Sequence, residues 1–235
     1  MEHIKMKKYK QPSAQRGLNN FFKRIPMSTD NTWGIPIIQK QCMEIPTQLT
    51  GFNFCLKKSP TKNDFVHFFL DDYQFERVWN YPQKYIERFK KHGGVLSPDF
   101  SMYLDMPLAL QIFSVYKNRW IGAYMQNCGI KVIPTISWGT SESYDFSFQG
   151  VEVGSIVAIS TVGVLNNSYS KKVFVEGYNE MIKRLKPEKI LIYGKSIPEA
   201  QGIYYKSYME ITNAKIKKER DTVWVDEVHL AELNR

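Results

Sequence analysis

Five apolar stretches between Phe65 and Lys195 each end at a polar side chain beside glycine or proline. They are rich in Val, Ile, Leu or Phe, and helical sequence separates most of them. Strands buried on both faces give continuous apolar runs of this kind, and such strands belong to parallel sheets covered by helices. The predicted strands are Phe65–Leu70, Gly94–Ser97, Lys131–Ser137, Ser155–Thr161 and Lys189–Tyr193. The pattern predicts an α/β fold built mainly of parallel β-α units.

Helix signals occupy the intervals between these strands. Asn80 caps one helix, and Asp105 caps a long helix that extends to Cys128. Shorter helices are expected at Glu142–Gln149, Glu176–Leu185 and Pro198–Tyr208, with a loop at Gly163–Ser170. Additional strand candidates are Ile35–Gln39, Ile211–Ile216 and Thr222–Val228, although an irregular segment that wraps over the barrel or sheet is an equal alternative for Ile35–Gln39.

Two architectures fit such units: a barrel-like or incomplete (β/α) barrel, and an open doubly wound sheet. In both, ligands bind at the carboxyl ends of the strands. An open sheet needs polar groups mainly at one switch point, whereas here most strand ends carry them. The barrel-like form is therefore preferred.

Positive charge is concentrated at the amino terminus. Residues 1–24 contain seven basic residues and one acidic residue, a net charge of +6, whereas the other 211 carry 25 basic and 22 acidic residues, or +3. We expect residues 1–30 to form a basic, largely disordered arm and residues 31–235 a single α/β domain. Basic arms attract phosphate backbones, although a merely solvated terminus is the alternative. The candidate nucleic-acid-binding residues are Lys5, Lys7, Lys8, Lys10, Arg16, Lys23 and Arg24.

Several functional classes lack their sequence signatures. The sequence has no apolar run of membrane-span length and no signal-peptide pattern, so a soluble cytoplasmic protein is expected. Cys42, Cys55 and Cys128 are widely spaced, which supports neither a zinc site nor a disulfide framework. The glycine-rich nucleotide-binding motifs and the G-x-S-x-G nucleophile motif are also missing.

Three aspartates are the catalytic candidates. Asp71 and Asp72 follow the first predicted strand, and only one of two adjacent side chains can face a central site. Asp99 follows the next strand, so parallel pairing would place it on the same rim. Two neighbouring carboxylates can act as acid and base, or hold Mg²⁺ through water, because one raises the pKa of the other. The alternative is that they cap turns and helices.

Polar and aromatic residues near the other strand ends are candidates for substrate binding. They are Trp138, Thr135, Ser137, Gln126, Ser160, Tyr193 and Lys195. An indole at a strand end can stack on a base or sugar, and a lysine beside glycine can hold phosphate. The alternatives are a core role for Trp138 and a solvated side chain for Lys195.

The stretch from His67 to Lys195 resembles a bacterial and phage family, domain of unknown function 4417. The residues that carry the resemblance are FFLDDYQFERVWNYPQKY, LSPDFSMYLDMPLALQ, GIKVIPTISW, GSIVAISTVG and MIKRLKPEKILIYGK. It implies a gene carried by prophages, plasmids or conjugative elements, and it assigns no catalytic residue. Asp99 also resembles the acting aspartate of nucleobase transglycosylases, but the zinc ligands of the tRNA-acting members have no counterpart here.

Two functional hypotheses follow from these features. The first is an enzyme of a mobile element that acts on nucleotides or nucleic acid, with its acidic site at the strand ends. The second is a non-catalytic factor that binds nucleic acid or a host protein and counters host defence.

Overall fold

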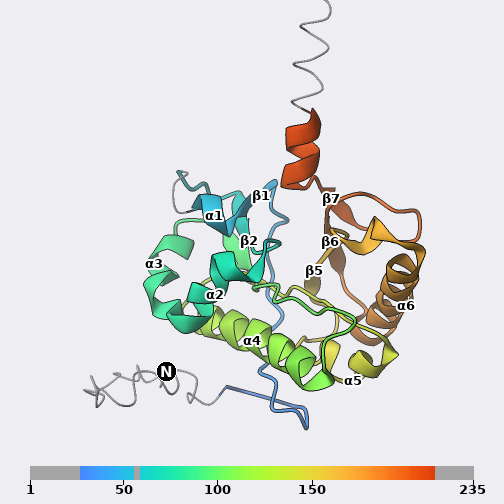
Figure 1. The fold of residues 1–235 in the computed structure, drawn as a ribbon. Coiled ribbons are helices and arrows are strands. Elements are labelled where there is room, and N and C mark those ends of the chain that lie inside the picture. Colours follow the sequence, from blue (N-terminus) through green and yellow to red (C-terminus); the bar gives the residue numbers. More distant parts are fainter. Residues whose placement is uncertain (1–26, 56–58, 215–235) are drawn as a thin grey trace, which may run out of the picture.

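The computed structural model describes residues 27–55 and 59–214, and Figure 1 shows strands surrounded by helices. The strands are β1 (Gln48–Gly51), β2 (Asp64–His67), β3 (Gly94–Leu96), β4 (Val132–Ile133), β5 (Ile156–Ser160), β6 (Lys189–Tyr193) and β7 (Ile203–Tyr205). The helices are α1 (Phe52–Cys55), α2 (Asp72–Asn80), α3 (Ile86–Phe89), α4 (Leu108–Asn127), α5 (Tyr144–Ser147) and α6 (Ser168–Leu185). Short 3₁₀ turns are η3 (Pro82–Lys84), η4 (Ser141–Ser143) and η5 (Val164–Asn166). No helix in the described ranges combines the length and the apolar composition that crossing a bilayer requires.

The strands are parallel and follow one another in sequence order. One sheet has the order β1-β2-β3-β4 and the other β5-β6-β7. A parallel bridge between Thr135 and Ala158 joins them, with hydrogen bonds of 2.8 Å from Ile136 N to Ala158 O and 2.9 Å from Ala158 N to Pro134 O. A doubly wound sheet would reverse its strand order at a switch point. The uninterrupted order therefore fits an incomplete barrel, and the predicted fold class is confirmed.

The inner faces of the strands share one core. Side chains from β2 to β6 form a single buried cluster, and Leu49 of β1 and Tyr205 of β7 pack against it. The cluster consists of Phe65, Leu96, Ile133, Ile156, Ala158 and Leu191. No backbone pairing joins β7 to β1 within the described residues, but the Tyr205 hydroxyl donates to Pro46 O at 2.6 Å. Side chains therefore fill the interior of the incomplete barrel. The gap in backbone pairing between β7 and β1 is called the seam.

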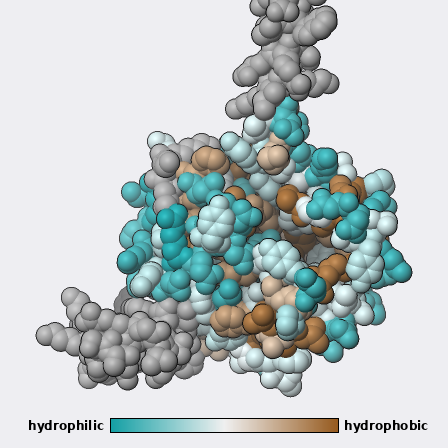
Figure 2. Space-filling view, viewed as in Figure 1, coloured by the Kyte–Doolittle hydropathy of each residue, from teal (hydrophilic) through white to brown (hydrophobic). Residues whose placement is uncertain are grey.

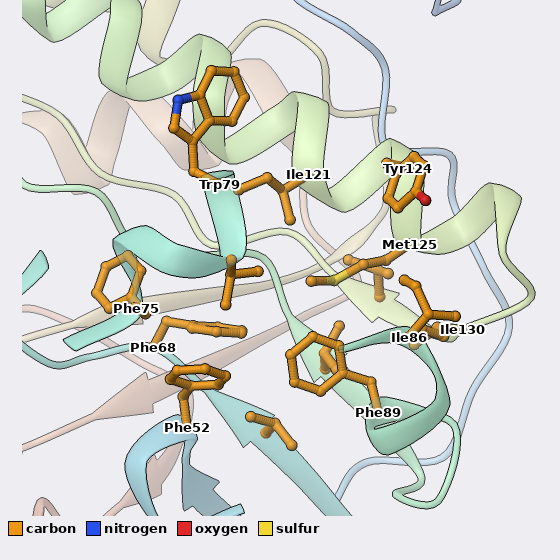
Figure 3. Close-up of a cluster of buried hydrophobic side chains, with 14 of the residues drawn as sticks. Phe52, Phe68, Phe75, Trp79, Ile86, Phe89, Ile121, Tyr124, Met125 and Ile130 are labelled. Carbon is orange, nitrogen blue, oxygen red and sulfur yellow. The ribbon is translucent and has the colours of Figure 1, made fainter. Parts of the chain in front are cut away.

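The outer faces pack against the helices. Side chains alternate along β2, so that Phe65 lies in the inner cluster while Val66 and Phe68 lie in an outer one. Figure 3 shows this outer cluster, in which Phe68 meets Phe52, Phe75 and Phe89 beneath Ile121 and Met125 of α4. A second outer cluster lies between β5, β6 and α6. Both faces of the strands are therefore buried, as their continuous apolar sequences predicted.

The elements that the sequence analysis missed are short or carry loop-like composition. β1 contains a single large apolar residue, and α2 begins at Asp72, where the prediction ended a strand. α6 begins at Ser168 within the predicted loop, because Asn167 caps it by accepting a hydrogen bond from Ser170 N at 2.8 Å.

Several predicted elements are wrong. Pro198–Tyr208 is not a helix, because β7 lies within it. Of Ile35–Gln39, only Ile38 forms a β-bridge, with Val151. Residues 208–214 are helical rather than extended, since Ser207 and Glu210 form a capping box at the start of this helix. The N-cap of α4 is Pro107 and not Asp105. The strand predicted at Thr222–Val228 and the basic arm up to residue 26 lie outside the described residues.

A buried acid–imidazole pair holds the amino-terminal end of the barrel. His92 Nδ1 lies 3.3 Å from Asp64 Oδ2, and neither side chain has any exposed surface. Asp64 begins β2, and His92 lies two residues before β3. Within the described residues, neither side chain has a hydrogen-bond partner, so this 3.3 Å contact is the polar interaction on which each depends.

We predict that His92→Leu lowers the free energy of unfolding by about 3 kcal/mol, because Asp64 is left buried and unpaired. The double variant Asp64→Leu/His92→Leu should be less destabilised than the sum of the two single variants. Urea denaturation measures all three, with exposed Asp105→Leu as the control. Additive effects would show that the two side chains are not coupled.

Candidate functional site

The backbone ladder between β3 and β4 ends at Ser97. Its last rung is the hydrogen bond of 2.9 Å from Ser97 N to Ile133 O, and in a longer parallel ladder Thr135 N would donate to Ser97 O. The Ser97 side chain replaces the missing contact, because its Oγ accepts from Thr135 N at 2.8 Å. The two strands are therefore held together by a side chain at the point where their backbones separate.

Two residues of α4 fill the gap between the separated strands. Asn118 Oδ1 accepts from Ser97 Oγ at 2.7 Å, and Asn118 Nδ2 donates to Thr135 O at 3.2 Å. Arg119, 1% exposed, donates from Nη1 to Thr135 O at 2.8 Å, from Nη2 to Ser147 O at 3.0 Å and from Nε to Gln149 O at 3.0 Å. Burial lowers the pKa of Arg119 to about 9, while the negative charge of Asp99 acts in the opposite direction. A buried positive charge thus lies behind the ends of β3 and β4.

Asp99 lies in the loop after β3 and is partly buried. Burial raises its pKa to about 7, and the negative charge of Asp72 adds to this shift. A hydrogen bond with Ser137 and the charge of Arg119 act against it by favouring the ionised form. Folding therefore favours the protonated acid. This contribution to stability is complete below the ordinary pKa of 3.8 and is lost as the pH rises through about 7.

Asp72 is the member of the Asp71/Asp72 pair that approaches Asp99. Its carboxylate accepts from Ser101 N at 3.1 and 3.2 Å and from Ser101 Oγ at 2.9 Å, which ties α2 to the loop after β3. Asp71 is exposed, and its carboxylate accepts only a long local bond of 3.5 Å from Gln74 Nε2 among the hydrogen bonds of the described residues. Parallel strands thus bring Asp72 and Asp99 to one rim, and Asp71 points elsewhere.

Trp138, the aromatic candidate for substrate binding, packs against the hydrophobic core. Its ring centroid lies 5.3 Å from that of Phe174 and 6.1 Å from that of Phe148. A Cβ added to Gly177 of α6 would lie 2.2 Å from the indole, so only glycine leaves room for it. The structure therefore gives Trp138 a packing role against α6 and does not bring it to the acidic pair.

Gln126 lies at the opposite end of the molecule. Its amide accepts from Gln39 N and donates to Gln39 O, both at 2.9 Å. It also donates to Gln41 Oε1, which accepts from the N–H of Val132 at the start of β4. Gln126 therefore attaches the segment before β1 to the amino-terminal end of the barrel.

The remaining predicted residues stay at the carboxyl ends of the strands. Ser160 Oγ accepts from Val162 N at 3.1 Å and donates to Tyr193 O at 3.3 Å, which links the ends of β5 and β6. Lys195 is exposed after β6, and its carbonyl accepts from Thr161 Oγ1 at 2.8 Å. Thr135 Oγ1 is buried and has no hydrogen-bond partner within the described residues. Of the predicted substrate-binding residues, Ser137 alone contacts the acidic pair.

The two carboxylates do not form a dedicated metal cage. Among the described residues, no group of three or more His, Cys, Asp or Glu side chains could hold an ion. Both oxygens of Asp72 already accept hydrogen bonds from Ser101, so coordination of Mg²⁺ would compete with these bonds.

Comparison with known proteins places the chain in one family. A sequence model of the domain of unknown function DUF4417 matches residues 27–213. The chain belongs to this family. Gene 1 protein of Mycobacterium phage L5 is 37% identical over 179 residues, which cover 73% of this chain and 76% of that protein. Gene 1 protein of Mycobacterium phage D29 is 32% identical over 213 residues, which cover 87% and 76%. No solved structure matches.

The family match extends beyond the segment in which the sequence resemblance was seen. It includes β1 and β7, which lie on either side of His67–Lys195. The predicted resemblance to DUF4417 is therefore confirmed, and the matched region contains every strand of the incomplete barrel.

Sequence reasoning missed Arg119, Asn118 and Ser101. Arg119 and Asn118 lie within a long helix, where a polar residue normally indicates a solvated face. One sequence signal could have identified Arg119. The helix contains few charged residues and is apolar on most sides, which is typical of a buried helix. Burying a charged side chain in such a helix costs free energy, so its presence there indicates a specific role.

We predict that Asp72→Asn lowers the pKa of Asp99 by about one pH unit, because it removes the nearby negative charge. Ser137→Ala should raise that pKa, because the ionised carboxylate loses a donor. Titration of the Asp99 side-chain carbon by NMR measures both changes, and Asp71→Asn is the matched control. A titration near pH 4 in the unmodified protein would contradict the assignment.

Proposed function

We propose that this DUF4417 protein is an enzyme that uses Asp99 for acid–base catalysis on a nucleotide or nucleic acid, in the cytoplasm of the cell that carries its gene. The observation that carries the proposal is that parallel strands place Asp99 and Asp72 together at one rim, where burial raises the pKa of Asp99 to about 7. An acid whose pKa lies near the working pH exists in both protonation states, so it can donate and accept a proton in one cycle. Strongly shifted acids at such positions are typical of active sites.

The neighbouring groups have distinct roles in this proposal. Asp72, held by Ser101, keeps part of the Asp99 population protonated through its negative charge. Ser137 supports the ionised form through a hydrogen bond, and buried Arg119 limits how far the pKa rises. These roles belong to side chains of the described residues, among which no group of three or more His, Cys, Asp or Glu could hold a metal ion.

Charge and relatedness support the choice of substrate class. Residues 1–24 carry a net charge of +6, which would attract a polyanion at low ionic strength. Lys195 adds an exposed positive charge at the same end of the strands as Asp99. The compared relatives are phage proteins, and a phage gene product meets nucleic acid and nucleotides in its host.

We predict that Asp99→Asn lowers turnover at least about 100-fold, the lower range for loss of a general acid or base. The full-length chain is incubated with single- and double-stranded DNA, RNA and nucleotides, and products are separated by chromatography. Asp71→Asn is the matched control, since Asp71 is exposed and close in sequence. Turnover in the unmodified protein should change across pH 7.

Two results would contradict this proposal. One is equal turnover by Asp99→Asn and the unmodified protein, with circular dichroism showing that both are folded. The other is an absence of turnover on every nucleotide and nucleic acid tested, although Asp99 titrates near pH 7.

A second candidate function, the binding of a host protein, is favoured by exposed apolar side chains at the amino-terminal end of α4 and in the loop before it. Leu104, Leu108, Leu110 and Phe113 are 36%, 41%, 52% and 47% exposed. Figure 2 shows hydrophobic residues gathered over the end of α4 that lies beside α5. Contiguous apolar surface of this kind is typical of interaction sites.

For this second candidate, we predict that Phe113→Glu abolishes cross-linking to a host protein in cells, because a charge placed at the centre of an apolar contact is not compensated. Ile182→Glu on α6, where Ile182 is 38% exposed, is the control. Cross-links retained by Phe113→Glu would contradict a role for this surface.

A further inference from the structure

Three aromatic rings meet at the carboxyl-terminal end of the barrel interior. His67, the last residue of β2, faces Tyr193 of β6 with 4.5 Å between ring centroids. Phe69 stacks on Tyr193 at 5.0 Å with an interplanar angle of 17°, and its ring lies 5.6 Å from that of His67. The Tyr193 hydroxyl accepts from Tyr208 N at 3.0 Å. The stack therefore spans the mouth of the barrel from β2 to β6.

His67 is neutral and its tautomer is set by the backbone. Burial lowers its pKa to about 3, even though the charge of Asp64 acts in the opposite direction. Phe69 N donates to His67 Nδ1 at 3.2 Å, so the ring proton lies on Nε2. Within the described part of the chain, this Nε2–H donates to no protein group. His67 thus presents one unused donor and no charge.

An unused acceptor lies beside this donor. Asn53 Oδ1 is buried and has no hydrogen-bond partner among residues 27–55 and 59–214. Gly51, the last residue of β1, lies between the two: a Cβ added there would lie 2.7 Å from Asn53 Oδ1 and 3.5 Å from His67 Nε2. Because both distances start from the same added Cβ, the distance from His67 Nε2 to Asn53 Oδ1 cannot exceed the sum of the two.

Leaving Asn53 Oδ1 without a partner is costly, because a buried acceptor has lost its hydrogen bonds to water and gains none from the protein. A ligand that offers a donor to Asn53 and an acceptor to His67 would satisfy both groups. Because His67 is uncharged and Asn53 presents a carbonyl oxygen, the pair favours a neutral ligand over a phosphate.

We propose that His67 and Asn53 bind the hydrogen-bonding edge of a nucleobase at the mouth of the barrel. Every nucleobase carries a donor and an acceptor on neighbouring atoms of one edge, which matches the unused pair. Phe69, partly exposed, offers an aromatic surface beside it. The inference rests on and deepens the proposed function, since Asp72 follows His67, the last residue of β2, by five positions, and Asp99 lies in the loop after the neighbouring strand β3.

Two variants separate recognition from folding. His67→Phe keeps an aromatic ring in the stack and removes the donor. Gly51→Ala places a methyl group between the donor and the acceptor, and the backbone of Gly51 does not occupy the left-handed region that excludes alanine. Asn166→Leu, on the exposed turn η5, is the matched control.

The test uses the full-length chain with ¹⁵N-labelled histidine. Adenosine, guanosine, cytidine, uridine and thymidine are titrated separately, and ribose 5-phosphate serves as the sugar-phosphate control. We expect at least one nucleoside to shift the His67 Nε2 resonance, and ribose 5-phosphate to leave it unchanged. His67→Phe and Gly51→Ala should each weaken that binding about tenfold, the equivalent of one lost hydrogen bond, while Asn166→Leu should not.

The outcomes distinguish this inference from the proposed function. A His67 signal that no nucleoside shifts, or equal nucleoside binding by His67→Phe and the unmodified protein, overturns the base site. If turnover still depends on Asp99 in that case, the proposed function stands without it. If nucleosides bind at His67 but no nucleotide or nucleic acid is turned over, the base site stands and the acid–base role fails.

Discussion

The candidate site depends on the point at which the backbone ladder between β3 and β4 ends. Ser97 N donates to Ile133 O as the last rung, and the next donor, Thr135 N, turns to the side-chain oxygen Ser97 Oγ. The two backbones therefore separate directly after their last pair. Ser97, Asn118 and Arg119 occupy the resulting space, and Asp99 and Ser137 lie directly beyond it. Thr135 O, which a longer ladder would pair with the backbone after β3, accepts from Asn118 and Arg119 instead.

This arrangement is unfavourable in isolation, which is the main reason to associate it with function. Burying Arg119 costs several kcal/mol unless its donors are satisfied. Three backbone carbonyls and Asn118 Oδ1 accept from them, and no ion pair of Arg119 with a carboxylate occurs in the described part of the chain. Asp99 likewise remains close to Asp72 although their charges repel. A core built for stability alone would replace such groups with apolar side chains. Violations of local rules of this kind concentrate at functional sites.

The sequence predicted those features that depend on hydrophobic runs and on parallel pairing. β6 has the residues that its apolar run indicated, and the convergence of Asp72 and Asp99 follows from two parallel neighbours that end at one rim. It could not predict features set by tertiary contacts. Trp138 at a strand end is equally compatible with a ligand and with a core, and the contact with Gly177, 39 positions away, decides between them. In the sequence, His67 belongs to an apolar strand, and only the fold brings Gly51 and Asn53 beside it.

The seam between β1 and β7 has a consequence for assembly. Both are edge strands whose outer backbone groups have no ladder partner within the described residues. Long exposed edges invite pairing with other chains and promote aggregation. Here the edges are only four and three residues long, and the Tyr205 hydroxyl already engages the backbone at Pro46 across the seam. A strand from another chain would have to displace this contact and would gain only a few backbone hydrogen bonds in return. The incomplete barrel therefore resists polymerisation although it is not closed.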